Sequence, residues 1–529
     1  RRRTILQINN LLKINQITII MKFKSLLIAS ILAAGLSACN KDNEFKGEEP
    51  TNVNTYMTLQ IVGPQGTNTK TTAGEDGTQV GTSEENTISS AMIILYDTET
   101  LTVENTHTLS STDLLPTGNG YSTQALLAET GTYNVYVIAN PPKSFSVTEG
   151  TLISNITETL MQDQYAKENT FIMFNESNGA DKYSSNRIEI TAENDIERPA
   201  TCDPIALDRL AVKITSTPND NVNIEGVKNE FKNDGGTTNI ASVQLEGFKL
   251  LNGVTQTNLQ QKWTKATTEQ GSAAPWNNTL VTPQLENSTT GFYNHLTQFA
   301  SITKEDEAYT AAKDLYSFLP YYNTTNSTAA IYCMENNSTW NGSVIVPALN
   351  GNTTGLVYQW KVTLNENVSD ELAGENCFYS YNGKFFGKLE DIAATYPSVF
   401  EVAESSLEAA EAELSNAYSN TDKETAISNF RVKYNIKVYT EGIMYYIYYI
   451  KDQNYKQGED GEEEPYYSVM RNTIYGLTVE ALGRIGTDIP GGWNPESDPE
   501  DPIDQTNVYM IVQVKVNPWV LSNENITLE

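Results

Sequence analysis

The sequence predicts a mostly β protein of two or more domains with a few short helices. Charged residues make up only 19% of the 529 residues, and threonine, asparagine, serine, tyrosine and valine are abundant, which favours strands over helices. Several segments, beginning with Val53–Val62, alternate apolar and polar residues with the period of two that is typical of a half-buried strand. A chain of this length exceeds one comfortable core, so more than one domain is expected.

The first 38 residues differ from the rest, because they contain basic side chains and no acidic ones. Met21 begins the pattern of a bacterial secretory signal: a basic stretch at Lys22–Lys24, an apolar run at Ser25–Gly35, and small residues before Cys39. The apolar run is about eleven residues long, shorter than the roughly 20 needed to span a bilayer. We interpret residues 1–20 as upstream sequence translated from a misplaced start, and 21–38 as a signal peptide.

Cys39 at the expected cleavage point makes this signal a lipobox. Cleavage and diacylation of Cys39 would anchor the exported chain to outer-membrane lipid, because each buried CH₂ group of an acyl chain adds about 0.8 kcal/mol of membrane affinity. The alternative is a buried core cysteine after an apolar helix. The basic stretch, the apolar run and the small residues all favour the lipobox.

The charge balance argues against nucleic acid as a partner. Without residues 1–38 and their six basic side chains, 29 of the 35 basic residues remain against 66 acidic ones, a net charge of −37. Such a surface repels nucleic acid and anionic lipid.

The first β domain is expected to follow the strand Val53–Val62 and a long flexible loop at residues 63–85, in which Lys70 is the only basic residue. Further strands are predicted at residues 90–96, 121–127, 131–139, 171–175 and 187–191. We place residues 39–70 in a lipidated pro-segment and residues 71–202 in the first β domain.

The second β domain is expected at residues 203–506, beginning with strands at 210–216 and 242–251. Helical spacing predicts helices at 303–318 and at 405–417, the latter with Ser406 as N-cap. Residues 430–439 and 443–451 are predicted to be paired strands, in which the tyrosines of the second strand pack across the sheet.

The C-terminal residues 507–529 are expected to supply donor strands. Residues 508–516 alternate strictly, which places five apolar side chains on one face: Val508, Met510, Val512, Val514 and Val516. Asn517-Pro518-Trp519 is predicted to break this strand, and 520–528 offers a second short extended piece.

No catalytic or metal-binding pattern stands out. The two histidines, His107 and His295, lie beside no nucleophile elbow, and no zinc spacing occurs among the cysteines. We therefore name no catalytic residue, no metal site and no cofactor. Cys202, Cys333 and Cys377 are expected to be packed and unpaired, although one disulfide is possible.

Six short segments together resemble the major subunits of the short (Mfa-type) fimbriae, the Bacteroidales type V pili of the fimbrillin group. They lie in family order along nearly the entire chain: Val135–Pro142 (VYVIANPP), Phe171–Asn175 (FIMFN), Arg209–Ile214 (RLAVKI), Ile331–Asn336 (IYCMEN), Arg471–Thr478 (RNTIYGLT) and Val516–Val520 (VNPWV). The resemblance implies two tandem antiparallel β-sandwich-like (transthyretin-like) domains in a structural protein that is not an enzyme.

The resemblance also implies maturation at the cell surface. A trypsin-like protease would cut after Lys70, where many relatives have arginine, and the lipidated piece would leave with its strand. The displaced side chains would be those of Val53, Thr55, Met57, Leu59 and Ile61. The C-terminal strands of an identical or related subunit would then fill the groove, which gives a head-to-tail fimbria that supports adhesion.

Other functions fit part of the same pattern. A monomeric surface lipoprotein that binds glycan or a host protein would keep its first strand and Cys39, as would an unprocessed anchor or accessory subunit of the pilus. A surface glycoside hydrolase would need a suitably spaced pair of carboxylates in a cleft, and the sequence singles out no such pair.

Overall fold

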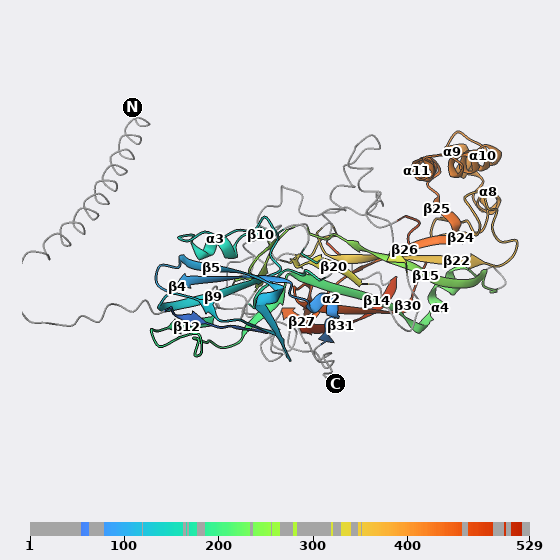
Figure 1. Cartoon of the computed structure of the whole chain (residues 1–529). Coiled ribbons are helices and arrows are strands. Elements are labelled where there is room, and N and C mark those ends of the chain that lie inside the picture. Colours follow the sequence, from blue (N-terminus) through green and yellow to red (C-terminus); the bar gives the residue numbers. More distant parts are fainter. Residues whose placement is uncertain are drawn as a thin grey trace, which may run out of the picture. The chain divides into compact units, whose positions relative to one another are not determined.

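Strands dominate the described part of the chain, which confirms the mostly β class (Figure 1). The structure is a computed structural model. It describes residues 54–62, 79–118, 120–161, 165–166, 169–176, 186–232, 236–254, 256–264, 279–282, 319–320, 330–339, 347–350, 352–457, 464–489, 502–503 and 509–520. The predicted helix at 303–318, Cys39, Lys70 and Val53 lie outside these residues.

The first half of the described chain forms a nine-stranded sheet. Its neighbouring strands, in spatial order, are β5 (Val103–Ser110), β4 (Ser90–Asp97), β9 (Gly131–Ala139), β11 (Met173–Asn175), β13 (Ile205–Arg209), β2 (Gln60–Val62), β7 (Gly120–Thr123) and β6 (Leu114–Thr117), and β12 (Asn186–Ile190) also pairs with β9. The short strand β1 (Tyr56–Met57) pairs with β8 (Leu126–Leu127).

Both faces of the central strands in this sheet are buried. On β4, Ile93 and Leu95 join one apolar cluster, whereas Ile94 and Tyr96 join another on the opposite face. Alternate side chains of a strand point to opposite faces, so two layers must cover the sheet. Helix α3 (Ile153–Thr157) belongs to the second layer.

Two further sheets pack face to face as a β-sandwich. One has the order β20 (Ala330–Met334), β14 (Ala211–Asn223), β30 (Thr473–Leu482), β31 (Met510–Val520) and β3 (Gln79–Val80), and the other has the order β19 (Leu319–Pro320), β15 (Ile240–Leu251), β22 (Gly355–Leu364) and β26 (Ile443–Tyr449). Their inner faces share one apolar cluster, in which Ser216 and Tyr358 also place their hydroxyl groups 2.7 Å apart.

The remaining described elements are short. The small sheets join β10 (Leu160–Met161) to β16 (Thr257–Asn258), β17 (Lys262–Thr264) to β18 (Thr279–Val281), β21 (Asn336–Asn337) to β29 (Ser468–Val469), β27 (Asp452–Gln457) to β28 (Glu464–Tyr466), and β24 (Lys384–Phe386) through β23 (Phe378–Tyr381) to β25 (Lys437–Tyr439). Helix α2 (Ser83–Asn86) precedes β4, helix α4 (Glu225–Glu230) follows β14, and two single 3₁₀ turns lie at Ser111–Asp113 and Thr440–Gly442.

Helices α8 (Leu389–Thr395), α9 (Ser398–Val402), α10 (Leu407–Tyr418) and α11 (Lys423–Tyr434) share an apolar cluster with β23 and β25. Figure 1 shows α9, α10 and α11 grouped together near α8 and β25. The predicted N-cap is confirmed, because Ser406 Oγ accepts a hydrogen bond from the Ala409 N–H at 3.2 Å.

The predicted strand at 430–439 is wrong over its first half. Residues up to Tyr434 belong to α11, which buries Ile427, Phe430 and Tyr434 at helical spacing and exposes 76% of Val432. The apolar residues at 430, 432 and 434 alternate as in a strand. The buried residues 427, 430 and 434, however, have the spacing of one face of a helix. Strand β25 then pairs with β23, and β26 pairs with β22, so the two are not partners of each other.

Two other expectations need correction. The predicted loop at 63–85 is regular at its end, because residues 79–80 form β3 and Thr82 with Glu85 forms a capping box around α2. Asn517-Pro518-Trp519 does not break the last strand, since β31 continues to Val520. Proline lacks the backbone N–H and has a restricted φ, but a strand can pass through it where that donor is not needed.

Candidate functional site

The segment around β1 and β2 is bonded to the protein along both of its edges. On one edge, Tyr56 N–H donates to Asn194 O at 2.8 Å and Thr58 N–H donates to Ala200 O at 2.9 Å. Further along the same edge, β2 runs parallel to β13. The segment therefore lies inside the sheet and would leave a gap with an open strand edge if it were removed.

The other edge is held by β7 and β8. Ala128 N–H donates to Thr55 O, and Thr123 N–H donates to Leu59 O, both at 2.9 Å. Leu59 N–H donates to the hydroxyl of Thr123 at 3.0 Å, which bridges the short break between β1 and β2. Backbone donors and acceptors on both sides would lose their partners on removal of the segment.

The side chains of this segment alternate as the sequence predicts. Thr55, Met57, Leu59 and Ile61 are buried, while Gln60 is exposed. Met57, Leu59 and Ile61 belong to the apolar cluster beneath the nine-stranded sheet. A strand that supplied alternating apolar side chains could occupy the same place.

Strand β31 is docked in its own subunit. It runs antiparallel to β30 over nearly its whole length, and its other edge pairs with β3 at Trp519 and Val520. Met510 and Val516 are buried, and Val512 and Val514 are half-buried on the same face. Of the predicted donor residues, only Val508 lies outside the described part of the chain.

A buried arginine, Arg209, joins the end of β13 to β31 and α2. Its guanidinium donates to Trp519 O at 3.0 Å, to Asn472 Oδ1 at 3.1 Å, to Glu85 O at 3.1 Å and to Asn86 Oδ1. The same group lies 4.4 Å from the centre of the Trp519 ring, which adds a cation–π contact. Burial lowers the pKa of Arg209 to about 10, so the group stays charged at neutral pH.

The carboxylate of Glu85 balances this positive charge. Its Oε1 lies 2.8 Å from Lys213 Nζ, in a pair whose side chains are 3% and 11% exposed, and it accepts a hydrogen bond from the Tyr332 hydroxyl. Burial alone would raise the pKa of Glu85, but the bonds from Lys213 and Tyr332 outweigh it and lower the pKa. Glu85 also caps α2 by accepting from the Thr82 N–H at 2.8 Å.

We call these side chains the Arg209 junction: Gly81, Glu85, Asn86, Arg209, Lys213, Tyr332, Asn472 and Trp519. Gly81 lies against its centre, because a Cβ at this position would stand 2.6 Å from Trp519 Nε1 and 2.5 Å from Asn86 Oδ1. The backbone N–H of Trp519 donates to Asn472 O at 3.0 Å, and Asn472 takes the left-handed conformation with φ 54°. The junction thus fixes the end of β31 from three sides.

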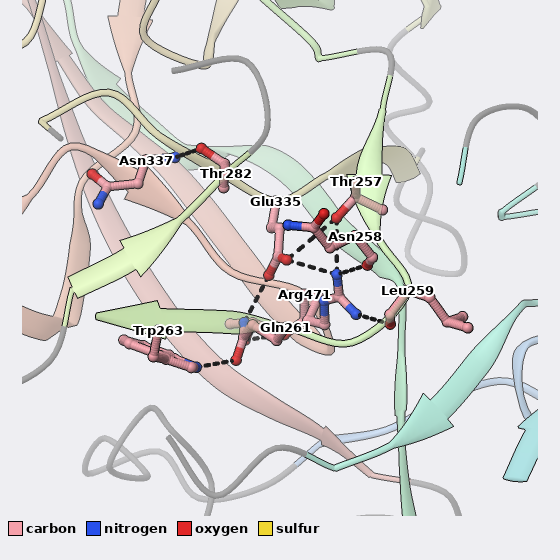
Figure 2. Close-up of polar contacts among 10 residues, drawn as sticks. Thr257, Asn258, Leu259, Gln261, Trp263, Thr282, Glu335, Asn337 and Arg471 are labelled. Atoms are coloured by element: carbon pink, nitrogen blue, oxygen red, sulfur yellow. Dashed lines mark hydrogen bonds and ion pairs between the residues drawn. The ribbon is translucent and has the colours of Figure 1, made fainter. Parts of the chain in front are cut away.

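A second buried arginine, Arg471, directly precedes Asn472 in the sequence. Arg471 Nη2 is 2.7 Å from Glu335 Oε1, and the two side chains are 2% and 1% exposed. Figure 2 shows how the guanidinium also donates to Leu259 O at 2.7 Å and to the Thr257 hydroxyl at 2.8 Å, while Gln261 Nε2 donates to Glu335 Oε2. This network ties β16 to the start of β30, and β16 in turn pairs with β10 of the first half.

Both networks include residues from the segments that carry the sequence resemblance. Arg209 and Lys213 come from RLAVKI, and Arg471 with Asn472 comes from RNTIYGLT. IYCMEN supplies Tyr332 and Glu335, and VNPWV supplies Trp519. Sequence patterns did not point to these residues as a site. The available signal is a charged residue two positions before an apolar strand, as at Arg209 before β14 and Arg471 before β30.

The thiols in the described part of the chain are unpaired. Cys333 and Cys377 are buried and Cys202 is half-buried. Burial raises the pKa of Cys333 and of Cys377 to about 12, and that of Cys202 to about 11, so all three stay protonated at neutral pH. These cysteines therefore have the character of packed side chains.

The described residues contain neither a metal-binding cluster nor a membrane-spanning helix. Within them, no three His, Cys, Asp or Glu side chains gather closely enough to hold a metal ion. None of the helices that the structure describes has the length and apolar character required to cross a bilayer.

Comparison with known families finds matches for two separate parts of the chain. Residues 55–209 match the family described as "Major fimbrial subunit protein (FimA)". Residues 437–525 match "Major fimbrial subunit protein type IV, Fimbrillin, C-terminal". The chain carries two fimbrial-subunit domains. The first covers β2, its neighbours and Arg209, and the second covers β30, β31 and Trp519, so the resemblance to fimbrial subunits is confirmed.

Solved structures of fimbrial proteins are similar to the chain. One is a fimbrilin (fimA) from Porphyromonas gingivalis W83, with 13% identity over 89% of this chain and 99% of that chain, and a TM-score of 0.43. Another is the tip fimbrial protein Mfa3 from Porphyromonas gingivalis, with 11% identity over 88% of this chain and 100% of that chain, and a TM-score of 0.36. No curated protein matches the sequence. The two family matches therefore carry the assignment.

The family matches also bear on location and activity. Fimbrial subunits lie in a surface fimbria, and both matched families are structural, so no catalytic family is indicated.

Proposed function

We propose that this protein is the precursor of a fimbrial stalk subunit that polymerises by strand exchange. It is exported as a lipoprotein through Cys39, cut after Lys70 by a trypsin-like surface protease, and assembled head to tail with identical or related subunits. Its place in the fimbria gives it a role in adhesion.

One observation supports this proposal above the others. The segment at 54–62 is bonded on both edges within a sheet, yet it joins the rest of the protein downstream only through residues 63–78, which contain Lys70. A single cut there would leave β1 and β2 held by non-covalent contacts alone. The released groove would be lined with open strand edges and an apolar floor, which a second strand can complete.

The free energy of such an exchange is substantial. Met57, Leu59 and Ile61 are fully buried, and burial of large apolar side chains contributes about 1.5–3 kcal/mol each. Refilling the groove with three such side chains therefore recovers on the order of 5–9 kcal/mol, an upper figure because unfolded chains already bury some surface. The cost of undocking the donor strand from its own subunit offsets part of this gain, so the difference between the two drives assembly.

The donor in this proposal is the C-terminal strand of the neighbouring subunit. Met510, Val512, Val514 and Val516 repeat the inward alternation of the displaced strand. Residues 520–528 extend the candidate donor. Since Met510, Val516 and Trp519 also complete the subunit's own core, deletion of residues 507–529 would cost stability, and a test on the processing site is cleaner.

The test replaces the proposed cleavage residue. Lys70→Gln should abolish the trimmed form and leave monomers, while the matched variant Lys143→Gln, at the next basic residue, an exposed lysine after β9, should give normal fibres. Electron microscopy and immunoblotting of sheared surface protein measure both results. Fibres of normal length from Lys70→Gln would contradict the proposal and favour a subunit that keeps its first strand.

A further inference from the structure

Strand β13 physically connects the displaced strand to the docked C-terminal strand. Ile205 and Ala206 at its start pair with Ile61 and Val62 of β2. Three residues further on, at its end, Arg209 binds the carbonyl and the ring of Trp519. A loss of β2 therefore removes one edge partner from the strand that positions Arg209.

The apolar core makes the same connection. Trp519 lies in one buried cluster with Met57, Leu59 and Ile61, the side chains that leave with the displaced strand. Phe171 packs edge-on against Trp519 with ring centres 5.7 Å apart. Protein interiors are close-packed, so removal of three large side chains from this cluster loosens the packing of those that remain.

The chain just downstream of the proposed cut makes a third contact with β31. Gln79 and Val80 of β3 run parallel to Trp519 and Val520, and Gly81 lies against the Trp519 ring. In the intact precursor this segment is tethered on both sides. After a cut at Lys70 it lies near a free chain end, where strands fray.

We propose that the Arg209 junction is a latch that keeps β31 docked in its own subunit while β1 and β2 are in place, and lets it go when they leave. This inference rests on the proposed function. The groove that receives the released strand belongs to a second copy of the chain. Removal of the N-terminal strand then creates the acceptor groove and frees the donor in one event, so the precursor stays monomeric until it is processed.

The chemistry of the junction suits a contact that must open. The buried indole N–H of Trp519 has no hydrogen-bond acceptor among the described residues, and an unsatisfied buried donor costs about 1–3 kcal/mol. The charge of Arg209 is fully desolvated, a cost that its hydrogen bonds must offset. Apolar burial of Trp519 offsets these costs only while the surrounding cluster is complete.

Hydrogen exchange on the uncleaved precursor tests the latch. In a Lys70→Gln background, Gly81→Ala inserts a methyl group between Trp519 and Asn86. Peptides covering residues 510–520 should exchange about tenfold faster or more, while those of β4 keep their protection. Gly118→Ala is the matched control, because its added Cβ meets nothing within 4 Å. Unchanged exchange in β31, or equal loosening of β4, would overturn the latch.

Glu85→Gln provides a second variant that keeps the shape of the side chain. It removes the charge that pairs with Lys213, and it should increase exchange in residues 510–520 in the same direction as Gly81→Ala. A Glu85→Gln precursor with β31 as protected as in the parent would also count against the latch.

The link to processing is measured separately on the cut protein. At a dilution at which light scattering shows monomers, protease-treated wild-type protein without its N-terminal strand should lose protection in β31 and keep it in β14. Equal protection of β31 before and after removal of the strand would refute the coupling even if fibres still form. Failure of cleavage at Lys70 would refute the proposed function, while the Gly81→Ala comparison would still decide on the latch.

Discussion

Arg209 and Arg471 are the residues whose roles depend most on distant parts of the chain. Arg209 binds Glu85 and Trp519, which lie 124 and 310 residues away. Periodicity shows that a charged residue precedes each strand, but it says nothing about which distant acceptors meet it. The strand alternation of Thr55 to Ile61 was predictable from the sequence because it is local, whereas the junction depends on the tertiary fold.

The buried pair Arg471–Glu335 leads to a prediction at this scale. Arg471→Met should lower the free energy of unfolding by roughly 3–5 kcal/mol, because Glu335 is left as an uncompensated buried charge. The double variant Arg471→Met/Glu335→Leu should recover most of that loss, since an apolar pair needs no desolvation of charge.

Urea unfolding of the Lys70→Gln precursor measures these changes. Arg484→Met, at an exposed arginine, serves as the control and should change the free energy by no more than about 0.5 kcal/mol. Equal losses in the single and double variants would show that the network does not act as an ion pair.

Among the elements, strand β2 has a role that changes during the life of the protein. Leu59→Ala should destabilise the precursor by about 2–5 kcal/mol, because it opens a cavity in a closed core. The same substitution should leave the stability of assembled fibres unchanged, since the strand is absent from them. Val137→Ala, in β9 of the retained sheet, should destabilise both forms.

Thermal melting of precursor and of purified fibres separates these outcomes. A Leu59→Ala fibre that melts as early as a Val137→Ala fibre would mean that β2 remains in the assembled subunit.

The errors at the element scale have a common cause. Residues 430–434 and 517–519 were assigned from local signals, an alternating apolar run and a proline. The helix partner Ile427 and the strand partner Thr473 of Pro518 outweigh those signals. Element type was predictable where burial follows one period, as in β9. The prediction failed where two periods overlap and where a proline lies within a strand.

At the scale of the whole molecule, two sheets meet where β13 gives way to β14. The change of sheet occurs between Arg209 and Ala211, and the boundary predicted at 202/203 remains a prediction. Strands β3 and β31, which are far apart in the sequence, both return to this region, because they pair with each other beside β30. A fold that brings these strands together can couple an event at one to the other.

The most direct test of strand exchange is the N-terminal sequence of the protein sheared from intact cells. Strand exchange predicts a start at Thr71, with the lipidated segment and strands β1 and β2 removed from the fimbria. A lipid-blocked start at Cys39 in the assembled protein would contradict it, because the groove would then still hold its own first strand.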